Sequence, residues 1–168
     1  NDDAKFWIPT ENEWYKAAYH KNDGVTGNYW DYPTSSDSRP SNDLVNPDPG
    51  NNANFANFID DSYTIGGPYW MTEVGEFENS ESPYGTFDQG GNVDEWNETL
   101  IDDYCRGLRG GSWCGDSVAL LASYRSGSYP TSKYSVIGFR VASVPEPASI
   151  WLMLGGGLAG LYWWRRRR

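Results

Sequence analysis

Three residues with oxygen-bearing side chains, Asp88, Asn92 and Glu95, lie within one short segment that also contains two glycines. This set suits a hard cation such as calcium, which takes six to eight oxygen ligands from carboxylates, amides and backbone carbonyls. The same residue types also form turns and helix caps. The segment therefore predicts a calcium site, with a purely hydrogen-bonded turn as the alternative.

Sulfur and imidazole groups are scarce. The chain has two cysteines, Cys105 and Cys114, and one histidine, His20. In an oxidising compartment the cysteines are near enough in sequence to pair, but their separation in space is not fixed by sequence, so a disulfide stays open. Two cysteines and one histidine do not make a zinc site. His20 follows a helical pattern and is predicted to be solvated.

The sequence contains no established catalytic pattern. Residues 110–114 resemble a nucleophile elbow around Ser112 only superficially, because Cys114 stands where G-x-S-x-G requires glycine. No phosphate-binding G-x-x-x-x-G-K-[ST] run occurs. Many carboxylates are present, but nothing selects one pair for acid–base chemistry.

The charge balance excludes one class of partner. The 168 residues carry a formal net charge of −10. Without Glu146 and the four C-terminal arginines, 22 acidic and 9 basic residues remain, a net charge of −13. Such a surface repels phosphates, so we expect no nucleic-acid binding. Aromatic residues make up 16% of the chain and predict a core of tryptophan and tyrosine.

The C-terminal segment has a distinct pattern. Pro145-Glu146-Pro147 is followed by an uncharged apolar run, 148–164, and by four arginines, 165–168. The run is near the lower length limit for a transmembrane helix, and arginine clusters stay on the cytoplasmic side. A plain membrane anchor would share this orientation. The order resembles the PEP-CTERM sorting signal of Gram-negative bacteria, which implies export, a cell-envelope location and processing by an exosortase.

The chain begins with Asn1 and has no basic-plus-apolar export signal near it. Because an outward-facing domain needs export, we expect further residues to precede Asn1 in the natural protein. We predict one domain over residues 1–143 that lacks its N-terminal part. The sorting signal, with a transmembrane helix over 148–164, is predicted to occupy 144–168.

One helix is clear in the sequence. Thr10 and Glu13 form a capping box, and Trp14, Ala17 and Ala18 form an apolar stripe. An Asp-Gly pair a few residues later is expected to end it. Short strand-like runs follow at 108–113, 120–124 and 137–142, and 34–54 is predicted to be a long surface loop.

Four segments, in order, resemble motifs of the sulfatase-modifying factor family, which includes the formylglycine-generating enzymes. The segments are Phe6–Ala18 (R-L-P-T-E-A-E-W-E-x-A-A), Tyr84–Trp96 (G-L-Y-D-M-x-G-N-V-W-E-W), Leu108–Trp113 (R-G-G-S-W) and Gly138–Arg140 (G-F-R). The resemblance extends from Phe6 to Ala142. It implies an α+β, C-type-lectin-like fold with little regular secondary structure.

Carried over by position, the calcium sites of that family fall on eight residues. The first set is Asp88, the carbonyls of Gly91 and Val93, and Glu95. The second set is the side chains of Asn54 and Asp61 with the carbonyls of Phe55 and Tyr63. The tripeptide 56–58 repeats the sequence of 53–55, which leaves a second register open. Asp94 departs from the family, which usually has tryptophan there.

The catalytic residues of the family are replaced in this chain. The formylglycine-generating enzymes hold copper with two cysteines, and these positions fall on Ser117 and Ala122. Neither supplies the thiolate or thioether that copper(I) prefers. We therefore expect no copper and a non-catalytic, calcium-stabilised surface module, with exopolysaccharide as a candidate partner. The alternatives are a structural coat protein and an oxidoreductase-type enzyme that uses ligands from a segment before Asn1.

Overall fold

The computed structural model describes residues 4–25 and 27–144. These residues form two compact units. One unit joins the residues up to Trp7 with those from Ala142 onward, and the other is Ile8–Val141. The first contains β1 (Phe6–Trp7) and β8 (Ala142–Ser143), which pair antiparallel.

The larger unit begins with α1 (Glu11–Tyr19), and the predicted capping box is confirmed. The Thr10 hydroxyl accepts from the Glu13 N–H at 3.3 Å, and the Glu13 carboxylate accepts from the Thr10 N–H at 2.8 Å. The helix ends before the Asp-Gly pair because His20 leaves the helical conformation. Its N–H still bonds the Lys16 carbonyl, which satisfies one group of the last turn.

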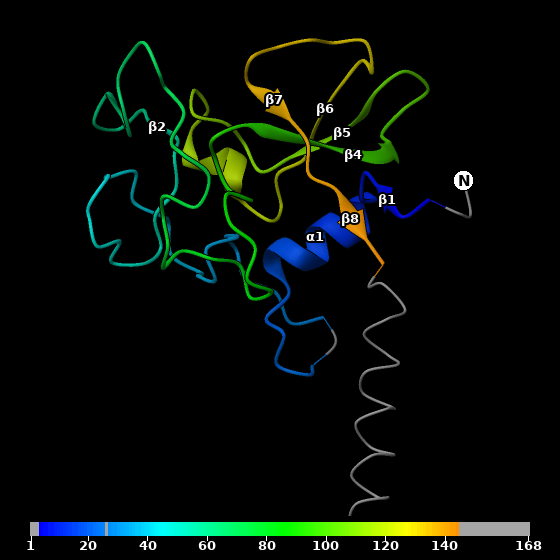
Figure 1. The fold of residues 1–168 in the computed structure, drawn as a ribbon, viewed down its shortest axis with the longest axis horizontal. Coiled ribbons are helices and arrows are strands. Elements are labelled where there is room, and N and C mark those ends of the chain that lie inside the picture. The colour runs from blue at the N-terminus through cyan, green and yellow to red at the C-terminus, as the bar shows by residue number, and fades with distance from the viewer. Residues whose placement is uncertain (1–3, 26, 145–168) are drawn as a thin grey trace, which may run out of the picture. The chain divides into compact units, whose positions relative to one another are not determined.

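A four-stranded sheet lies beside α1, which contacts β4 (Figure 1). The strands, in spatial order, are β6 (Ser126–Ser128), β5 (Arg106–Arg109), β4 (Asp94–Leu100) and β7 (Ile137–Gly138). β5 runs antiparallel to both of its neighbours, whereas β7 runs parallel to β4. This pairing places Glu95 of β4 between Arg109 of β5 and Gly138 of β7.

The predicted strands are only partly confirmed. β5 and β7 overlap the runs 108–113 and 137–142, but the strand expected at 120–124 is wrong. That region contains the end of a 3-10 helix, η1 (Ser117–Leu120), whose first turn is capped by the Asp116 side chain. The cap satisfies a free N–H group and favours the helical turn over an extended chain.

The segment before β4 is mostly irregular. No helix or strand is formed between residues 34 and 54, as expected, and the only regular pair nearby is the hairpin of β2 (Ala56–Asn57) and β3 (Ser62–Tyr63). Both statements concern the residues from 27 up to the start of β4, all of which the structure describes.

A buried carboxylate orders part of this segment. Asp48 accepts hydrogen bonds from the Ser80 hydroxyl at 2.7 Å, the Asn52 amide at 2.8 Å, and the N–H groups of Gly50 and Asn79 at 3.0 Å. Burial alone would raise the pKa of Asp48, but these bonds outweigh it and lower the pKa. The long loop is thus organised around a charged group in place of an apolar core.

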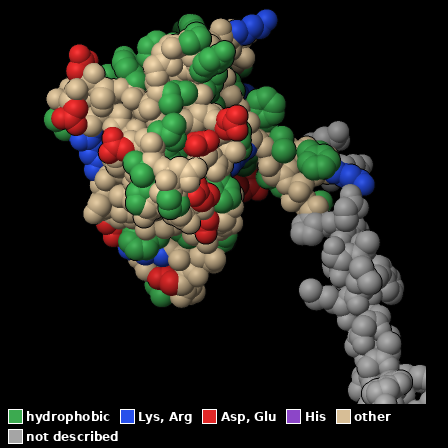
Figure 2. Space-filling view, turned by 60° about the vertical axis from the view of Figure 1, so that its left-hand side comes forward, with side chains coloured by type: hydrophobic (Ala, Val, Ile, Leu, Met, Phe, Trp, Pro, Cys, Tyr) green, Lys and Arg blue, Asp and Glu red, His purple; other side chains and the backbone are tan. Residues whose placement is uncertain are grey.

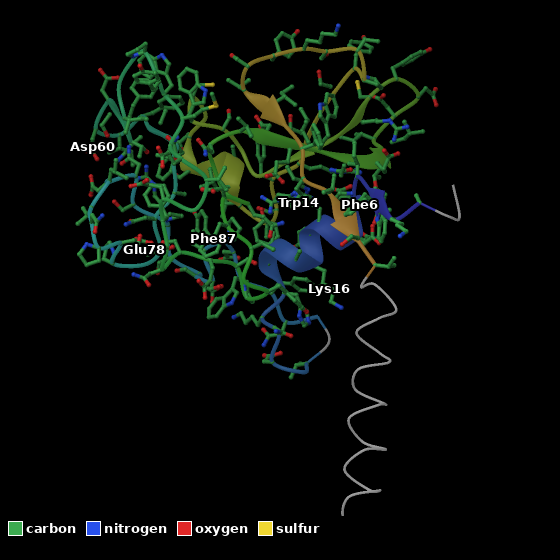
Figure 3. All side chains as sticks on the ribbon, viewed as in Figure 1. Phe6, Trp14, Lys16, Asp60, Glu78 and Phe87 are labelled. Atoms are coloured by element: carbon green, nitrogen blue, oxygen red, sulfur yellow. The ribbon has the colours of Figure 1, made fainter. Side chains whose placement is uncertain are left out.

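The core is aromatic, as the composition predicts. One buried cluster is Trp14, Ala18 and Tyr19, and the other is Tyr32, Ala53, Phe55 and Leu120. Trp14, labelled in Figure 3, extends from the side of α1 that faces the sheet. The Tyr19 hydroxyl donates to the Leu120 carbonyl at 3.0 Å and so links the two clusters.

An ion-pair network also attaches α1 to the rest of the unit. One oxygen of Glu11 accepts from Arg109 at 2.7 Å and 2.9 Å, and the other accepts from Arg125 at 2.5 Å. Burial alone would raise the pKa of Glu11, but the two guanidinium groups outweigh it and lower the pKa. The network therefore favours the ionised carboxylate at neutral pH.

None of the helices within residues 4–25 and 27–144 is long and apolar enough to span a bilayer. The helix predicted over 148–164 lies outside the described residues.

Candidate functional site

Glu95, the last member of the first predicted calcium set, is already engaged by the protein. Its side chain is 8% exposed. One oxygen accepts from the Arg140 Nη2 at 2.6 Å. The other accepts from the Arg140 Nε at 2.5 Å and from the Trp14 Nε1 at 2.6 Å. The charge of Glu95 is thus neutralised by a guanidinium group held in a two-bond geometry.

The rest of this set forms the same kind of internal contact. Arg140 also donates to the Phe87 carbonyl at 3.1 Å, which closes the segment between Phe87 and Glu95. Asp88 accepts from the Gly75 N–H at 2.7 Å, and burial raises its pKa. Gly91 has a φ of +80° and donates to the Gly110 carbonyl at 2.8 Å. Glu95 therefore uses both of its oxygens to bind protein donors, whereas Asp88 binds a protein donor through one oxygen.

The second predicted set is divided between two places. Asn54 is buried before the β2–β3 hairpin, whereas Asp61 lies in the turn that joins its strands. Because Ala56 pairs with Tyr63 and Asn57 with Ser62, these two residues lie at opposite ends of the hairpin. The Phe55 carbonyl accepts from the Asn42 amide at 3.4 Å. This set does not form one ligand sphere.

The alternative register for the second set, which uses Asn57 of the repeated tripeptide, is also taken up by protein contacts. The Asn57 amide oxygen accepts from Arg39 at 2.7 Å, and its nitrogen donates to Asp60 at 2.7 Å. In the described part of the chain, no three His, Cys, Asp or Glu residues form a group that could hold a metal ion. Calcium binding stays a prediction from the sequence that these contacts do not support.

The asparagines of the two predicted sites meet each other instead. The Asn54 amide donates to the Asn92 oxygen at 3.0 Å, and the Asn92 N–H donates to the Asn54 carbonyl at 2.8 Å. The two backbone segments are so close here that a Cβ on Gly91 would overlap the Asn54 backbone. Only glycine fits this approach at a positive φ. Asn54 and Asn92, which the sequence predicts as calcium ligands, therefore connect the two loops to each other.

This connection between the loops holds a third segment, residues 69–76, which we call the anchored segment. Asn54 donates to the Trp70 carbonyl at 3.0 Å. Asn92 accepts from the Thr72 N–H at 3.1 Å and donates to the Thr72 carbonyl at 3.2 Å. Together with the bond from Gly75 to Asp88, three side chains fix the backbone of the anchored segment.

Aromatic contacts add to these hydrogen bonds. The rings of Trp70 and Trp113 are stacked with centroids 5.1 Å apart, and the edge of Tyr63 meets Trp70 at 5.1 Å. Such pairs stabilise a fold beyond the area that they bury. Trp113 belongs to the R-G-G-S-W motif, so the anchored segment rests on motif residues from several parts of the chain.

A cavity of about 430 Å³ lies over the anchored segment. Its apolar lining is Leu44, Ile65, Tyr69 and Met71, and its polar lining is Thr72, Glu73 and Glu76. This site could not be found from the motifs, because its segment matches none of them. The signal that was present in the sequence is the apolar run 69–71, followed closely by two acids, Glu73 and Glu76.

The positions that correspond to the copper ligands of the family have structural roles. Ser117 is buried, and its hydroxyl accepts from the Arg39 Nε at 2.8 Å. Ala122 donates its N–H to the Asp31 carbonyl and accepts from Arg109 at its own carbonyl, at 2.8 Å and 2.9 Å. No sulfur group is present at either position.

The three remaining candidate groups are placed as follows. Cys114 is exposed, Cys105 is half-buried, and both are free thiols, so the open question of a disulfide is answered against it. His20 is half-buried and keeps part of its surface in solvent, and its ring binds the Tyr84 hydroxyl at 2.9 Å and the Val25 carbonyl at 3.1 Å.

Asp94 is the departure from the family pattern beside Glu95. Burial raises the pKa of its carboxyl, although hydrogen bonds with the Ser112 hydroxyl and the Gly111 N–H act in the opposite direction. The shift means that the folded protein disfavours a charge at this position.

Comparison with solved structures identifies the fold. The chain is 25% identical to "Treponema denticola variable protein 1" (TM-score 0.53; 83% of this chain and 48% of that one). For CarF the identity is 23% (TM-score 0.55; 86% and 51%). For PvdO from Pseudomonas aeruginosa it is 18% (TM-score 0.52; 83% and 53%). The chain spans about half the length of each of these structures, and no curated protein matches it.

Two family patterns match the sequence and confirm both resemblances. Residues 143–168 match the PEP-CTERM protein-sorting motif, which identifies an exported protein of the cell envelope that an exosortase-type enzyme processes. Residues 3–144 match the Sulfatase-modifying factor enzyme 1-like domain. Because this match covers most of the chain, and the solved structures share its mixed sheets and few helices, the chain belongs to the sulfatase-modifying factor enzyme 1-like family.

Proposed function

We propose that this chain is a non-catalytic binding module held at the bacterial cell surface, and that its partner is matrix exopolysaccharide. Export and sorting follow from the C-terminal motif. The single-pass anchor over 148–164 before processing, the absence of catalysis and the partner belong to the proposal. A coat protein without a ligand is the competing non-catalytic role.

The observation that carries the proposal is the chemistry at Ser117 and Ala122. The Ser117 hydroxyl is bound by Arg39, and Ala122 contributes only backbone groups. Copper(I) needs soft ligands, which neither residue offers. The positions that hold the metal in the formylglycine-generating enzymes are used here for hydrogen bonding within the fold.

Catalysis is tested with the full chain in detergent, incubated with copper(I) and a cysteine-containing peptide. We expect no formylglycine product and no stoichiometric copper. The double variant S117C/A122C, which places thiols at both positions, is the matched comparison for metal binding. Turnover by the unaltered chain with bound copper would support the alternative, an oxidoreductase-type enzyme with ligands from a preceding segment.

Binding is tested by co-sedimentation with polysaccharide extracted from the matrix of the native cells, together with a glycan array. We expect retention of the full chain by the extracted polymer. Retention by neither the polymer nor any arrayed glycan would favour the coat protein over the binding module.

Calcium stabilisation remains a prediction from the sequence, and the contacts of Glu95 argue against it at the first site. Because Arg140 already neutralises this carboxylate, we expect chelation with EDTA to leave the Tm unchanged. A ligand that binds only the folded state raises its stability by mass action. A clear fall in Tm, with calcium found by elemental analysis, would restore the predicted site.

A further inference from the structure

The cavity over the anchored segment has the size and lining of a small-molecule site. Its volume of about 430 Å³ is within the usual range of ligand pockets. Tyr69 and Met71 line it and are 77% and 44% exposed as residues. Large apolar groups that stay in contact with water at a concave surface indicate a binding role.

The charged groups of this cavity are all of one sign. Glu73 and Glu76 line it, and no Lys, Arg or His does. Among the described residues, neither carboxylate forms a hydrogen bond or an ion pair with another side chain. Carboxylates in this state attract a cation and repel an anion.

The surface of the protein as a whole also attracts cations and repels anions. The chain carries a net charge of −10, and acidic side chains are spread over the face visible in Figure 2. An acidic polymer such as a polyuronate would meet repulsion both at the cavity and around it. A polymer with free amines would be attracted at both.

The neutral groups of the cavity suit a ligand with both apolar and polar faces. The Tyr69 ring offers an apolar surface and a hydroxyl to the C–H and O–H groups of a sugar ring. The Thr72 hydroxyl is buried and has no hydrogen-bond partner in the described part of the chain. Such an unsatisfied group is rare in a folded protein, and a rotation of the Thr72 side chain toward the cavity would let a ligand atom or a water molecule satisfy it.

The backbone beneath the cavity is fixed in advance. Asn54, Asn92 and Asp88 bind Trp70, Thr72 and Gly75 from below, so the residues between them are ordered before a ligand arrives. A preformed site loses less conformational entropy on binding.

We propose that this cavity binds amine-bearing sugar units, of the glucosamine type, in a cationic polysaccharide. The proposal rests on the proposed function and narrows its partner from any exopolysaccharide to a polymer with free amino groups. Glu73 and Glu76 bind the ammonium group, and Tyr69 and Met71 contact the sugar ring.

The test is calorimetric titration of the full chain in detergent with three oligosaccharides of equal length. These are glucosamine oligomers, N-acetylglucosamine oligomers, which lack the charge, and uronic acid oligomers, which reverse it. We expect the glucosamine oligomer to bind about tenfold more tightly than the acetylated one, the ratio for one favourable charge contact. We expect no binding of the uronic acid oligomer.

Two variants locate the site. E73Q/E76Q removes both cavity charges, and we expect it to weaken binding of the glucosamine oligomer at least about tenfold. The control E81Q/D103N removes the same charge from exposed positions that do not line the cavity, and we expect no change. Tyr69→Ala should weaken binding without altering its salt dependence. Unchanged Tm values will show that all variants fold.

The outcomes separate this proposal from the one on which it rests. Equal weakening by E73Q/E76Q and E81Q/D103N would mean non-specific attraction to an acidic surface and would overturn the cavity site. Binding of the native matrix polymer without binding of glucosamine oligomers would overturn the amine preference alone. Failure to bind either would overturn both proposals.

Discussion

The Glu95 carboxylate joins residues of three family motifs at one point. The resemblance implies a calcium ligand here, and in this structure the carboxylate binds Arg140 of the G-F-R segment and Trp14 of the first segment. Both of its oxygens are satisfied without an ion. Arg140 is therefore part of the structure of the Gly-rich loop, where it also donates to the Phe87 carbonyl.

We expect Arg140→Ala to lower the free energy of unfolding by about 3–5 kcal/mol, because it leaves the buried Glu95 charge unpaired. Urea denaturation measures this change. The matched control is Arg106→Ala, which breaks a partly exposed pair with Glu98 and should cost about 0–1 kcal/mol. A loss for Arg140→Ala as small as that of the control would show that another cation neutralises Glu95.

Asp94 gives a pH-dependent prediction. Burial raises its folded-state pKa, so the folded protein holds the proton of this carboxyl to a higher pH than the unfolded chain does. Its contribution to stability is present at low pH and is lost as the pH rises through the folded-state pKa. Asp94→Asn cannot ionise, and we expect it to have the higher Tm at pH 7.

The comparison of Tm values at several pH values checks this sign. The difference between Asp94→Asn and the unaltered chain should disappear below the ordinary aspartate pKa of 3.8, where both carry a neutral group. A difference that is independent of pH would show that packing, and not ionisation, separates the two proteins.

At the scale of elements, the anchored segment depends on Asn92. Its side chain makes three hydrogen bonds, and its φ of +62° is tolerated better by asparagine than by alanine. Each buried group that loses its partner costs about 1–3 kcal/mol. The shape of the cavity over residues 69–76 therefore depends on Asn92, although Asn92 does not line the cavity.

We expect Asn92→Ala to destabilise the protein by at least about 2 kcal/mol and to speed amide exchange at Thr72 and Gly75. Hydrogen exchange with mass spectrometry measures the local effect. Asn22→Ala is the matched control, because Asn22 also has a positive φ, of +52°, but is exposed. Unchanged protection of the anchored segment in Asn92→Ala would refute the anchoring role.

The elements that could be predicted from sequence are those with local signals. The capping box of Thr10 and Glu13 is a contact between neighbours, and α1 starts where it predicts. β4 was missed because two of its buried positions are polar, Glu95 and Asn97. Its pattern therefore lacks the alternation of apolar and polar residues that identifies a strand.

The candidate site was harder to predict for a related reason. The site residues were predicted from local motifs, but their partners in the structure come from distant segments. Arg140 lies 45 positions from Glu95, and Asn54 lies 38 positions from Asn92. Whether an oxygen binds an ion or a protein donor depends on which groups the tertiary fold brings to it, and no local pattern contains that information.

At the scale of the whole molecule, the sorting motif predicts a processing step. We expect replacement of Pro145 and Pro147 by alanine to prevent cleavage by the exosortase-type enzyme, so that the chain keeps its full size in membrane fractions. Immunoblotting of fractionated cells measures this. Pro130→Ala, a change outside the motif, should leave processing intact. Normal cleavage of the doubly altered chain would show that the tripeptide is not read.

The long sequence separation between Glu11 and its partners has a consequence for the order of folding. Its guanidinium partners, Arg109 and Arg125, follow it by 98 and 114 positions. During translation, Glu11 therefore leaves the ribosome long before Arg109 and Arg125 do. Contacts between residues that are so distant in sequence also form slowly. We expect the nascent polypeptide to stay loosely structured until most of it has been synthesised, which would keep it competent for translocation.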